Sequence, residues 1–430
     1  MARGLPGGLP RELTLDALDF ADFVRPGDTV TWGQAAAEPT PLTARLMAQR
    51  HRIGPFTAFL GISQSATPDP AFADTVRFTG YCGTGDNRRL AAAGLLDILP
   101  CHYSELAARL PGRVDVLLLQ LAQAPDGSGY SLGLAHEYLV PLVDRARVVI
   151  AEVNGRTPWT FGERLLRAGD LDAVVRTARA PAELAVPSPG PVEQAIARRV
   201  AALVEDGSTL QMGLGSLPGC ILAQLADRRD LGIHSGVIGD PVADLVAAGV
   251  VTNARKTIDA GLSVTGLLMG SRRLYDFAHR NPALALRSTA YTHSPAVLER
   301  IDRFVAVNAA IEVDLSGQVN AEVARGLYVG AVGGAVDFLR GAQRSKGGLP
   351  IVALPATVGG GAAGIGQGTA SRIVARLSGP VSTARSDAGI IVTEHGVADL
   401  RGLSLAQRVR RMIELADPAF RESLEREAGV

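Results

Sequence analysis

Two glycine-rich runs in this sequence have the composition of loops that approach a ligand. The first is Gly213-Leu214-Gly215-Ser216-Leu217-Pro218-Gly219, and the second is Gly330-Ala331-Val332-Gly333-Gly334-Ala335. Glycine lets the backbone come close to a bound group, and a helix N-terminus favours an anion. Each run also fits a plain structural turn that binds nothing, so composition alone leaves both interpretations open.

Side chains that can attack a carbonyl or move a proton are scattered along the chain. The Cys82 thiol would be nucleophilic if its pKa were lowered, although an unpaired cysteine is more often a small buried hydrophobe. Glu38 is a further candidate for proton transfer. Four histidines can act as general bases or as hydrogen-bonded structural residues: His136, His234, His293 and His395.

Composition excludes several classes of protein. The 430 residues include 43 Lys and Arg and 43 Asp and Glu, so no basic footprint for nucleic acid exists at the level of the whole chain. A hydrophobic content of 47% with 20% charged residues is typical of a globular protein. The three cysteines lack metal-ligand or disulfide spacing. The start from Met1 to Pro6 lacks the apolar core of a signal peptide, and no apolar run approaches the ~20 residues of a membrane span. We therefore expect a cytoplasmic protein.

Short apolar runs alternate with helical patterns, as in parallel α/β proteins. Buried strands are predicted over residues 114–121, 147–153, 304–308 and 350–354, whose near-continuous hydrophobicity suits coverage on both faces. Helices are predicted over residues 193–204 and 217–225. The proline-rich segment between residues 186 and 191 suits a linker. We therefore expect an N-terminal domain over residues 1–186 and a C-terminal domain over residues 192–430.

An ordered set of motifs along nearly the whole chain resembles one enzyme family. The set includes Ala37-Glu38-Pro39-Thr40, Gly85-Asp86-Asn87-Arg88-Arg89, the segment 210–240, the segment 311–320 and Ser345-Lys346-Gly347-Gly348. Each motif alone is weak evidence, but together they resemble the acetyl-CoA hydrolase / 4-hydroxybutyrate CoA-transferase family. The resemblance implies an α/β fold of two open-sheet domains with the active site between them.

The same resemblance implies that a catalytic group is missing. In the family, the residue that corresponds to Gly236 is a glutamate, whose carboxylate carries the acyl group and then CoA. Covalent catalysis of this kind needs a nucleophilic side chain, which glycine does not have. Ala335 also stands where the family has a glutamine. We therefore expect the family's fold and ligand without its usual covalent intermediate.

The resemblance further implies which residues lie at the site. The amides of Gly333 and Gly334 are expected to hold the oxyanion that forms on the thioester, and His234 or Glu38 is expected to act as the base. Lys346 is expected near the phosphates of coenzyme A. The residues expected to bind coenzyme A are Gly213, Gly215, Gly236, Gly330, Ala335, Lys346 and Gly347. No metal site is expected.

These expectations favour an acyl-CoA-dependent enzyme in which water, an amine or an alcohol attacks the thioester directly. Coenzyme A would then be part of the substrate and a product, and a small molecule would be the acceptor. Neither nucleic acid nor a membrane is expected as a partner, and a homo-oligomer is compatible with the sequence. Two alternatives stay open: a non-catalytic acyl-CoA-binding protein, and an ordinary CoA-transferase that uses another carboxylate.

Overall fold

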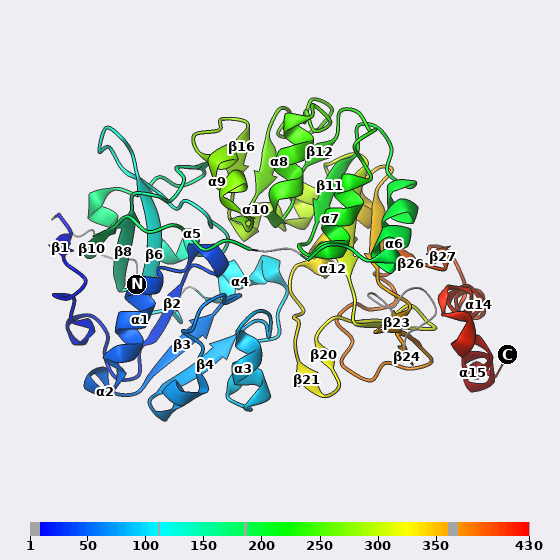
Figure 1. The fold of residues 1–430 in the computed structure, drawn as a ribbon, viewed down its shortest axis with the longest axis horizontal. Coiled ribbons are helices and arrows are strands. Elements are labelled where there is room, and N and C mark those ends of the chain that lie inside the picture. Colours follow the sequence, from blue (N-terminus) through cyan, green and yellow to red (C-terminus); the bar gives the residue numbers. More distant parts are fainter. Residues whose placement is uncertain (1–8, 111, 185–186, 360–368, 430) are drawn as a thin grey trace. The chain divides into compact units, whose positions relative to one another are not determined.

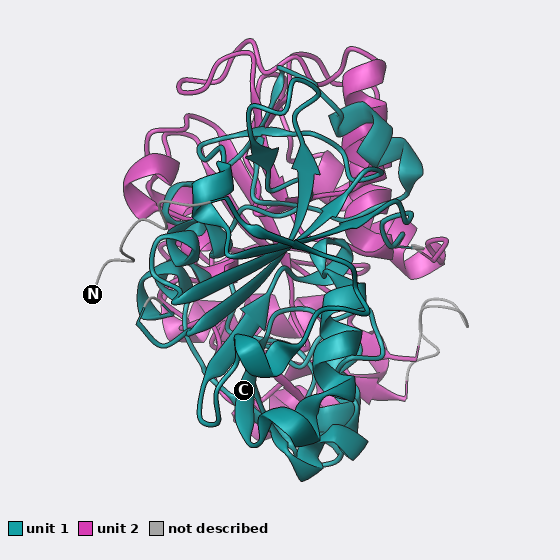
Figure 2. Cartoon of the chain, turned by 90° about the vertical axis from the view of Figure 1, so that its left-hand side faces the viewer, with its two compact units in different colours: residues 1–184, 264–292, 327–333 teal, residues 185–263, 293–326, 334–430 magenta. Residues whose placement is uncertain are grey.

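The computed structural model describes residues 9–110, 112–184, 187–359 and 369–429, which form two compact units (Figures 1 and 2). Unit 1 contains residues up to 184 together with 264–292 and 327–333. Unit 2 contains residues 185–263, 293–326 and 334–430. The chain thus returns twice to unit 1 after the predicted linker. Neither return is marked by a proline-rich segment, so composition gave no sign of it. Residue 186 and the N-terminal Met1 to Pro6 lie outside the described residues.

Unit 1 is built on one nine-stranded sheet in the order β1-β10-β8-β6-β2-β3-β4-β5, with β7 paired to β6. All its pairs are parallel except β6 with β7. The strands are β1 (Arg11–Leu13), β2 (Thr29–Trp32), β3 (Phe56–Leu60), β4 (Val76–Gly80), β5 (Leu96–Ile98), β6 (Val116–Gln123), β7 (Tyr130–Ser131), β8 (Val148–Asn154) and β10 (Ala173–Thr177).

In unit 1, several helices form the crossovers that parallel strands need. The α-helices are α1 (Thr40–Ala48), α2 (Arg50–Ile53), α3 (Asn87–Ala92), α4 (Tyr103–Arg109), α5 (Leu139–Val143), α9 (Arg272–Ala278) and α10 (Thr289–Thr292). A small sheet joins β14 (Ser263–Thr265), β16 (Leu284–Leu286) and β9 (Phe161–Gly162). The parallel pairing of β16 with β9 explains why the segment 264–292 belongs to unit 1. The remaining strands here are β15 (Leu267–Leu268) and β21 (Leu327–Tyr328).

Unit 2 is built on a six-stranded sheet in the order β12-β11-β17-β22-β26-β27, parallel except for its last pair. Its strands are β11 (Thr209–Met212), β12 (Gly232–Ile233), β17 (Phe304–Ala309), β22 (Leu349–Ala353), β26 (Ile390–Thr393) and β27 (Gly396–Asp399). The α-helices are α6 (Pro191–Ala201), α7 (Ser216–Ala223), α8 (Asp240–Ala247), α11 (Pro295–Leu298), α12 (Ala335–Arg344), α14 (Leu405–Leu415) and α15 (Pro418–Ala428). Shorter strands are β13 (Val237–Ile238), β18 (Glu312–Asp314), β19 (Val319–Asn320), β20 (Val323–Ala324), β23 (Thr357–Val358), β24 (Ala370–Ser371) and β25 (Ile373–Val374).

The α/β fold class with open parallel sheets is confirmed. The four predicted strands correspond to β6, β8, β17 and β22, and the two predicted helices correspond to α6 and α7. Residues Val116 to Ala122 of β6 and all residues of β8 are buried, as expected for strands with both faces covered. Each sheet therefore presents the carboxyl ends of neighbouring parallel strands along one edge, where open α/β proteins bind ligands.

Candidate functional site

The first glycine-rich run follows β11 directly and leads into α7, as its composition suggested. Gly215 has φ +123° and is the residue before the first turn of the helix. Only glycine adopts that conformation readily, so the turn requires it. A methyl group placed on Gly213 would meet no other atom within 4 Å. The backbone at Gly213 thus borders open space, which fits a loop that faces a ligand.

Gly236 lies beside the end of β11, at a bend between β12 and β13. The backbone N–H of His234 donates to the carbonyl of Leu210 at 3.0 Å, which continues the pairing of β12 with β11. The Ser235 hydroxyl donates to the carbonyl of Met212 at 3.0 Å or to that of Val237 at 2.8 Å. Because Met212 immediately precedes the glycine run, these bonds hold Gly236 close to the start of that loop.

The imidazole of His293 occupies the space where a side chain at Gly236 would begin. A Cβ atom on Gly236 would lie 2.8 Å from Cε1 and 2.9 Å from Nε2 of His293. A Cβ atom on Gly334 would lie 2.5 Å from Nε2 and 2.6 Å from Cδ2 of the same ring. All four distances are far below van der Waals contact, so the ring lies there only because both positions are glycine. The space beside the α-carbon of Gly236 is therefore filled by the ring.

Aromatic rings complete this histidine cluster, which we define as His234, His293, Phe304 and Phe338. The His293 ring packs on the Phe338 ring with centroids 4.4 Å apart. The His234 and Phe304 rings form a T-shaped pair with centroids 6.3 Å apart. Burial, with the nearby His234 as a smaller cause, lowers the pKa of His293 to about 3. The ring is therefore neutral near pH 7 and carries one N–H donor and one acceptor nitrogen.

The second glycine-rich run divides between the units. Gly334 is the residue before α12, so its amide lies at the positive end of the helix dipole. Gly333 pairs with His102 in a parallel bridge, and its carbonyl accepts the N–H of Tyr103 at 2.9 Å. Gly330 also belongs to unit 1, where its carbonyl accepts the N–H of Gly83 at 2.9 Å. The oxyanion role of Gly333 and Gly334 stays a prediction, and Gly334 has the more suitable position.

Lys346 and Gly347 lie at the other end of α12 from Gly334. A helix of ten residues is about 15 Å long, so these residues are separated from Gly334 by roughly that length. The carbonyl of Lys346 accepts the N–H of Arg303 at 2.8 Å, and its side chain is exposed. Its position also suits a cation that offsets the dipole at a helix C-terminus. Contact with a CoA phosphate stays a prediction for Lys346.

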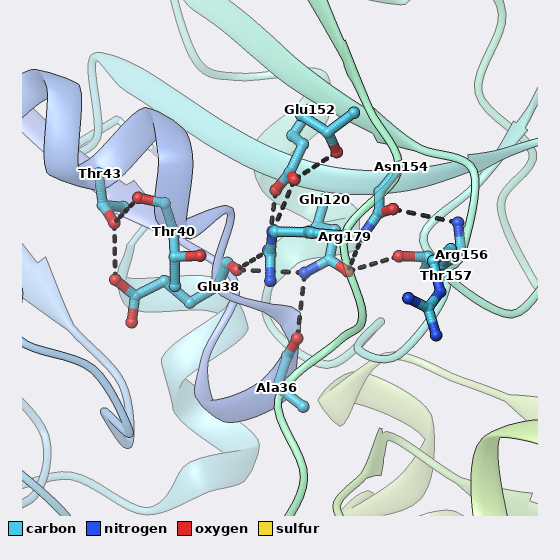
Figure 3. A network of polar contacts seen from close by, with 11 residues as sticks. Ala36, Glu38, Thr40, Thr43, Gln120, Glu152, Asn154, Arg156, Thr157 and Arg179 are labelled. Atoms are coloured by element: carbon cyan, nitrogen blue, oxygen red, sulfur yellow. Dashed lines mark hydrogen bonds and ion pairs between the residues drawn. The ribbon is translucent and has the colours of Figure 1, made fainter. Parts of the chain in front are cut away.

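Glu38 lies in unit 1 within a dense network of hydrogen bonds (Figure 3). Its carboxylate accepts the hydroxyls of Thr67 at 2.6 Å, Thr43 at 2.7 Å and Ser65 at 2.9 Å. Its carbonyl accepts Arg179 at 2.8 Å. Burial raises the pKa of Glu38, and the three hydroxyls oppose that rise. These contacts fix the loop between β2 and α1, so the structure gives this carboxylate a clear structural role; its role as a base stays a prediction.

The other nucleophile and base candidates lie in environments that suit structural roles. Burial raises the pKa of Cys82 to about 11, which disfavours the reactive thiolate. Burial lowers the pKa of His136 to about 3, and the ring is fully enclosed in unit 1. His395 lies near the C-terminal helices, with its Nε2 3.5 Å from a carboxylate oxygen of Asp417.

The structure also reveals a buried carboxyl group that the sequence did not single out. Glu137 is 2% exposed, and its carboxylate accepts the hydroxyl of Tyr103 at 2.7 Å and the amide of Gln34 at 2.7–2.8 Å. The Tyr81 hydroxyl donates to the other end of the Gln34 amide at 2.8 Å. Burial raises the pKa of Glu137 to about 7. These four residues are scattered between positions 34 and 137, so no local motif could have indicated the network.

Two general features bear on the function. Within the described ranges, no three His, Cys, Asp or Glu side chains gather as they would around a metal ion. None of the helices in those ranges is long and apolar enough to cross a membrane.

Comparison with known proteins places these features in a family. Residues 270–428 match the family described as Acetyl-CoA hydrolase/transferase C-terminal domain. The 4-hydroxybutyrate coenzyme A transferase of Clostridium kluyveri is 40% identical over 364 residues, which cover 83% of this chain and 82% of that protein. The crystal structure of RipA from Yersinia pestis matches with a TM-score of 0.90 and 32% identity over 97% of each chain. The 4-hydroxybutyrate CoA-transferase from Porphyromonas gingivalis matches with a TM-score of 0.80 and 32% identity, again over 97% of each chain.

Open parallel sheets with a glycine-rich loop at a strand end define an α/β protein of the kind that binds ligands at the carboxyl ends of its strands. The chain belongs to the acetyl-CoA hydrolase/CoA-transferase family. The family resemblance drawn from the sequence motifs is thus confirmed.

Proposed function

We propose that this enzyme transfers the acyl group of an acyl-CoA thioester directly to water, an amine or an alcohol, without a glutamyl-CoA intermediate. One observation carries the proposal. The volume beside the α-carbon of Gly236, the position that the family resemblance equates with the catalytic glutamate, holds the His293 imidazole. A carboxylate side chain therefore has no room there, whereas the imidazoles of His234 and His293 lie close to that position.

The reaction with water illustrates the proposed chemistry. The water oxygen bonds to the thioester carbonyl carbon while His234 takes one of its protons. The amide of Gly334, at the positive end of α12, stabilises the oxyanion of the tetrahedral intermediate. The intermediate then breaks its carbon–sulfur bond, and the CoA thiolate leaves and receives the proton from His234. The acid and free CoA are the products.

The neutral His293 ring has a supporting part in this proposal. Because its pKa is about 3, it stays neutral and does not compete with His234 for a proton near pH 7. A neutral imidazole also keeps its hydrogen-bonding pattern across that range. Its close packing against Phe338 and the two glycines fixes the ring beside the bend at Gly236. We propose that it positions the reacting groups.

The proposal is tested by following where the acyl group and CoA go. The purified enzyme is incubated with acetyl-CoA and longer acyl-CoAs in three mixtures: buffer alone, buffer with a primary amine, and buffer with isotope-labelled acetate. We expect free CoA with a free acid or an amide, and no label in acetyl-CoA. Labelled acetyl-CoA at rates comparable to CoA release would refute direct attack. Binding of acyl-CoA by calorimetry without any turnover would instead favour a non-catalytic binding protein.

A second candidate is ordinary CoA transfer to a carboxylate. It is favoured by the 40% identity to a protein named 4-hydroxybutyrate coenzyme A transferase. That chemistry needs a reactive carboxylate to replace the missing one. Glu137, whose pKa is about 7, is the first group to examine. Loss of labelled acetyl-CoA formation in Glu137→Gln, with CoA release to water retained, would support this second candidate.

A further inference from the structure

Two adjoining hollows lie at the carboxyl ends of three neighbouring strands in unit 1. The first has a volume of about 290 Å³ and the second a volume of about 210 Å³, and both are lined by Gly155, Thr157 and His279. The second is also lined by the last residues of β6, β8 and β10: Gln123, Asn154 and Thr177. This is the edge at which open parallel sheets bind ligands. All the lining residues belong to unit 1.

Four arginines line these hollows, which we call the arginine pocket. Arg156 and Arg272 line the first hollow, and Arg176 and Arg280 line the second. Arg272 pairs with Asp276 at 2.7 Å, and Asp276 is the one carboxylate among the lining residues. Arg176 pairs with Glu12, which does not line the hollows, so two of the four guanidinium groups already have an acidic partner. The excess positive charge of the pocket therefore comes from Arg156 and Arg280. Guanidinium groups bind phosphate and carboxylate oxygens through paired N–H bonds.

The backbone holds the two least engaged arginines in place. The Asn154 side chain accepts the N–H of Arg156 at 3.0 Å, and the Arg156 guanidinium extends away from the Glu38 network (Figure 3). On the other side, the N–H of Arg280 donates to the carbonyl of Trp159 at 2.8 Å. The N–H of Trp159 donates to Nδ1 of His279 at 3.1 Å. A neutral His279 therefore carries its proton on Nε2, which gives the pocket a further donor.

We propose that the arginine pocket binds a small polyanion of the phosphate class. The volume of each hollow is at or below the range of about 300–1,000 Å³ that is typical of small-molecule pockets. That size suits a phosphate or pyrophosphate group rather than a complete acyl-CoA. The anion is either a free molecule or the phosphate end of a larger ligand. This inference is independent of the proposed acyl transfer.

Pyrophosphate is the probe for this proposal. Trp159 lines the second hollow, and the other tryptophan, Trp32, is 3% exposed in the core of unit 1. Pyrophosphate added at constant ionic strength is therefore expected to change tryptophan fluorescence in a saturable way. The double variant Arg156→Gln/Arg280→Gln should weaken this binding on the order of 100-fold, since it removes two charge-assisted contacts. Trp159→Phe should remove the fluorescence change but keep a thermal shift with pyrophosphate.

A matched control separates a specific site from general charge. Arg25→Gln/Arg410→Gln removes two exposed arginines outside the pocket and should leave pyrophosphate affinity within about twofold. Equal weakening in both double variants, or the absence of saturable binding to the wild type, would overturn the proposal. Competition between CoA and pyrophosphate would identify the phosphates of CoA as the natural source of the anion, and the absence of competition would identify a separate polyanion. Either of these last two results supports the site.

Discussion

The buried carboxyl group of Glu137 in unit 1 and the buried imidazole of His293 in unit 2 are accommodated in opposite ways. Glu137 is surrounded by donors from Tyr103 and Gln34, and its pKa still rises to about 7. His293 packs against the Phe338 ring and two glycines, and its pKa falls to about 3. Burial of the carboxyl group is accompanied by several hydrogen-bond donors, and burial of the imidazole is accompanied by close packing against an aromatic ring.

This difference bears on the glutamate that the sequence resemblance leads us to expect at position 236. A new side chain there would meet the His293 ring at less than 3 Å, so a glutamate introduced at position 236 alone would conflict sterically with the ring. Room for it requires a smaller residue at position 293 as well. We therefore regard Gly236, Gly334 and His293 as one interdependent set, and the predictions below test that set against the Glu137 network.

The largest expected effect is on turnover. His234→Ala should lower the rate of CoA release on the order of 10²–10⁴-fold under saturating substrate, because it removes the proposed base. Glu38→Gln should keep turnover within about tenfold and lower stability instead, because its carboxylate accepts three hydroxyls. Steady-state assays of both variants measure the rate of CoA release and show which residue, if either, acts as the base. Nearly full turnover in both would exclude both residues as the base.

His293 should make the protein acid-sensitive. Its pKa falls from 6.5 to about 3 on folding, so its contribution to stability is lost as pH falls below 6.5 toward 3. The full effect is on the order of 5 kcal/mol in the free energy of unfolding. Urea unfolding of the wild type and His293→Gln is compared between pH 4 and pH 8. The stability advantage of the wild type should shrink on acidification, and an advantage independent of pH would show that the ring is not buried as a neutral group.

Glu137 should have the opposite pH dependence. Its pKa rises from 4.5 to about 7 on folding, so its contribution is present below pH 4.5 and is lost as pH rises to 7. The total change is at most about 3 kcal/mol. Glu137→Gln lacks this titration and keeps an amide of similar shape. The difference in unfolding free energy, wild type minus variant, should therefore fall between pH 4.5 and pH 7. A rising difference would contradict the assigned direction.

The smallest expected effect is steric. Gly334→Ala and Gly236→Ala should each lower stability by about 1–3 kcal/mol, because the new methyl group meets the His293 ring. Gly213→Ala is the matched control and should be close to neutral, since its methyl group would meet nothing within 4 Å. In the background of His293→Ala, the cost at positions 236 and 334 should largely disappear. Equal costs with and without the imidazole would show that the three positions are independent.

Sequence reasoning predicted the core strands, the glycine-rich turn and the family of the molecule well. Strands such as β6 and β8 are continuous apolar runs buried on both faces, and the run from Gly213 to Gly219 has the glycine spacing of a strand-to-helix turn. Both features are local, so they can be read from neighbouring residues. The family motifs are local as well, and the comparisons confirmed the family that they indicate.

Sequence reasoning could not predict which side chains come together at the site, because this depends on contacts between residues that are far apart in the sequence. His293 reaches Gly236 across 57 residues, and its importance follows only from the distance between the ring and a missing Cβ atom. The Glu137 network and the arginine pocket likewise combine residues from separate loops. Lys346 shows the converse, because a motif close to Gly334 in sequence lies at the far end of α12.

Direct attack without a covalent enzyme–CoA intermediate is the central claim, and trapping tests it most directly. The enzyme is incubated with an acyl-CoA substrate, treated with borohydride or hydroxylamine, digested and examined by mass spectrometry. We expect every Asp- and Glu-containing peptide to keep its unmodified mass while free CoA accumulates, because Gly236 offers no carboxylate and His293 fills the space beside it. A borohydride-reduced or hydroxamate-modified carboxylate, formed only in the presence of acyl-CoA, would contradict the account and identify the residue that carries the intermediate.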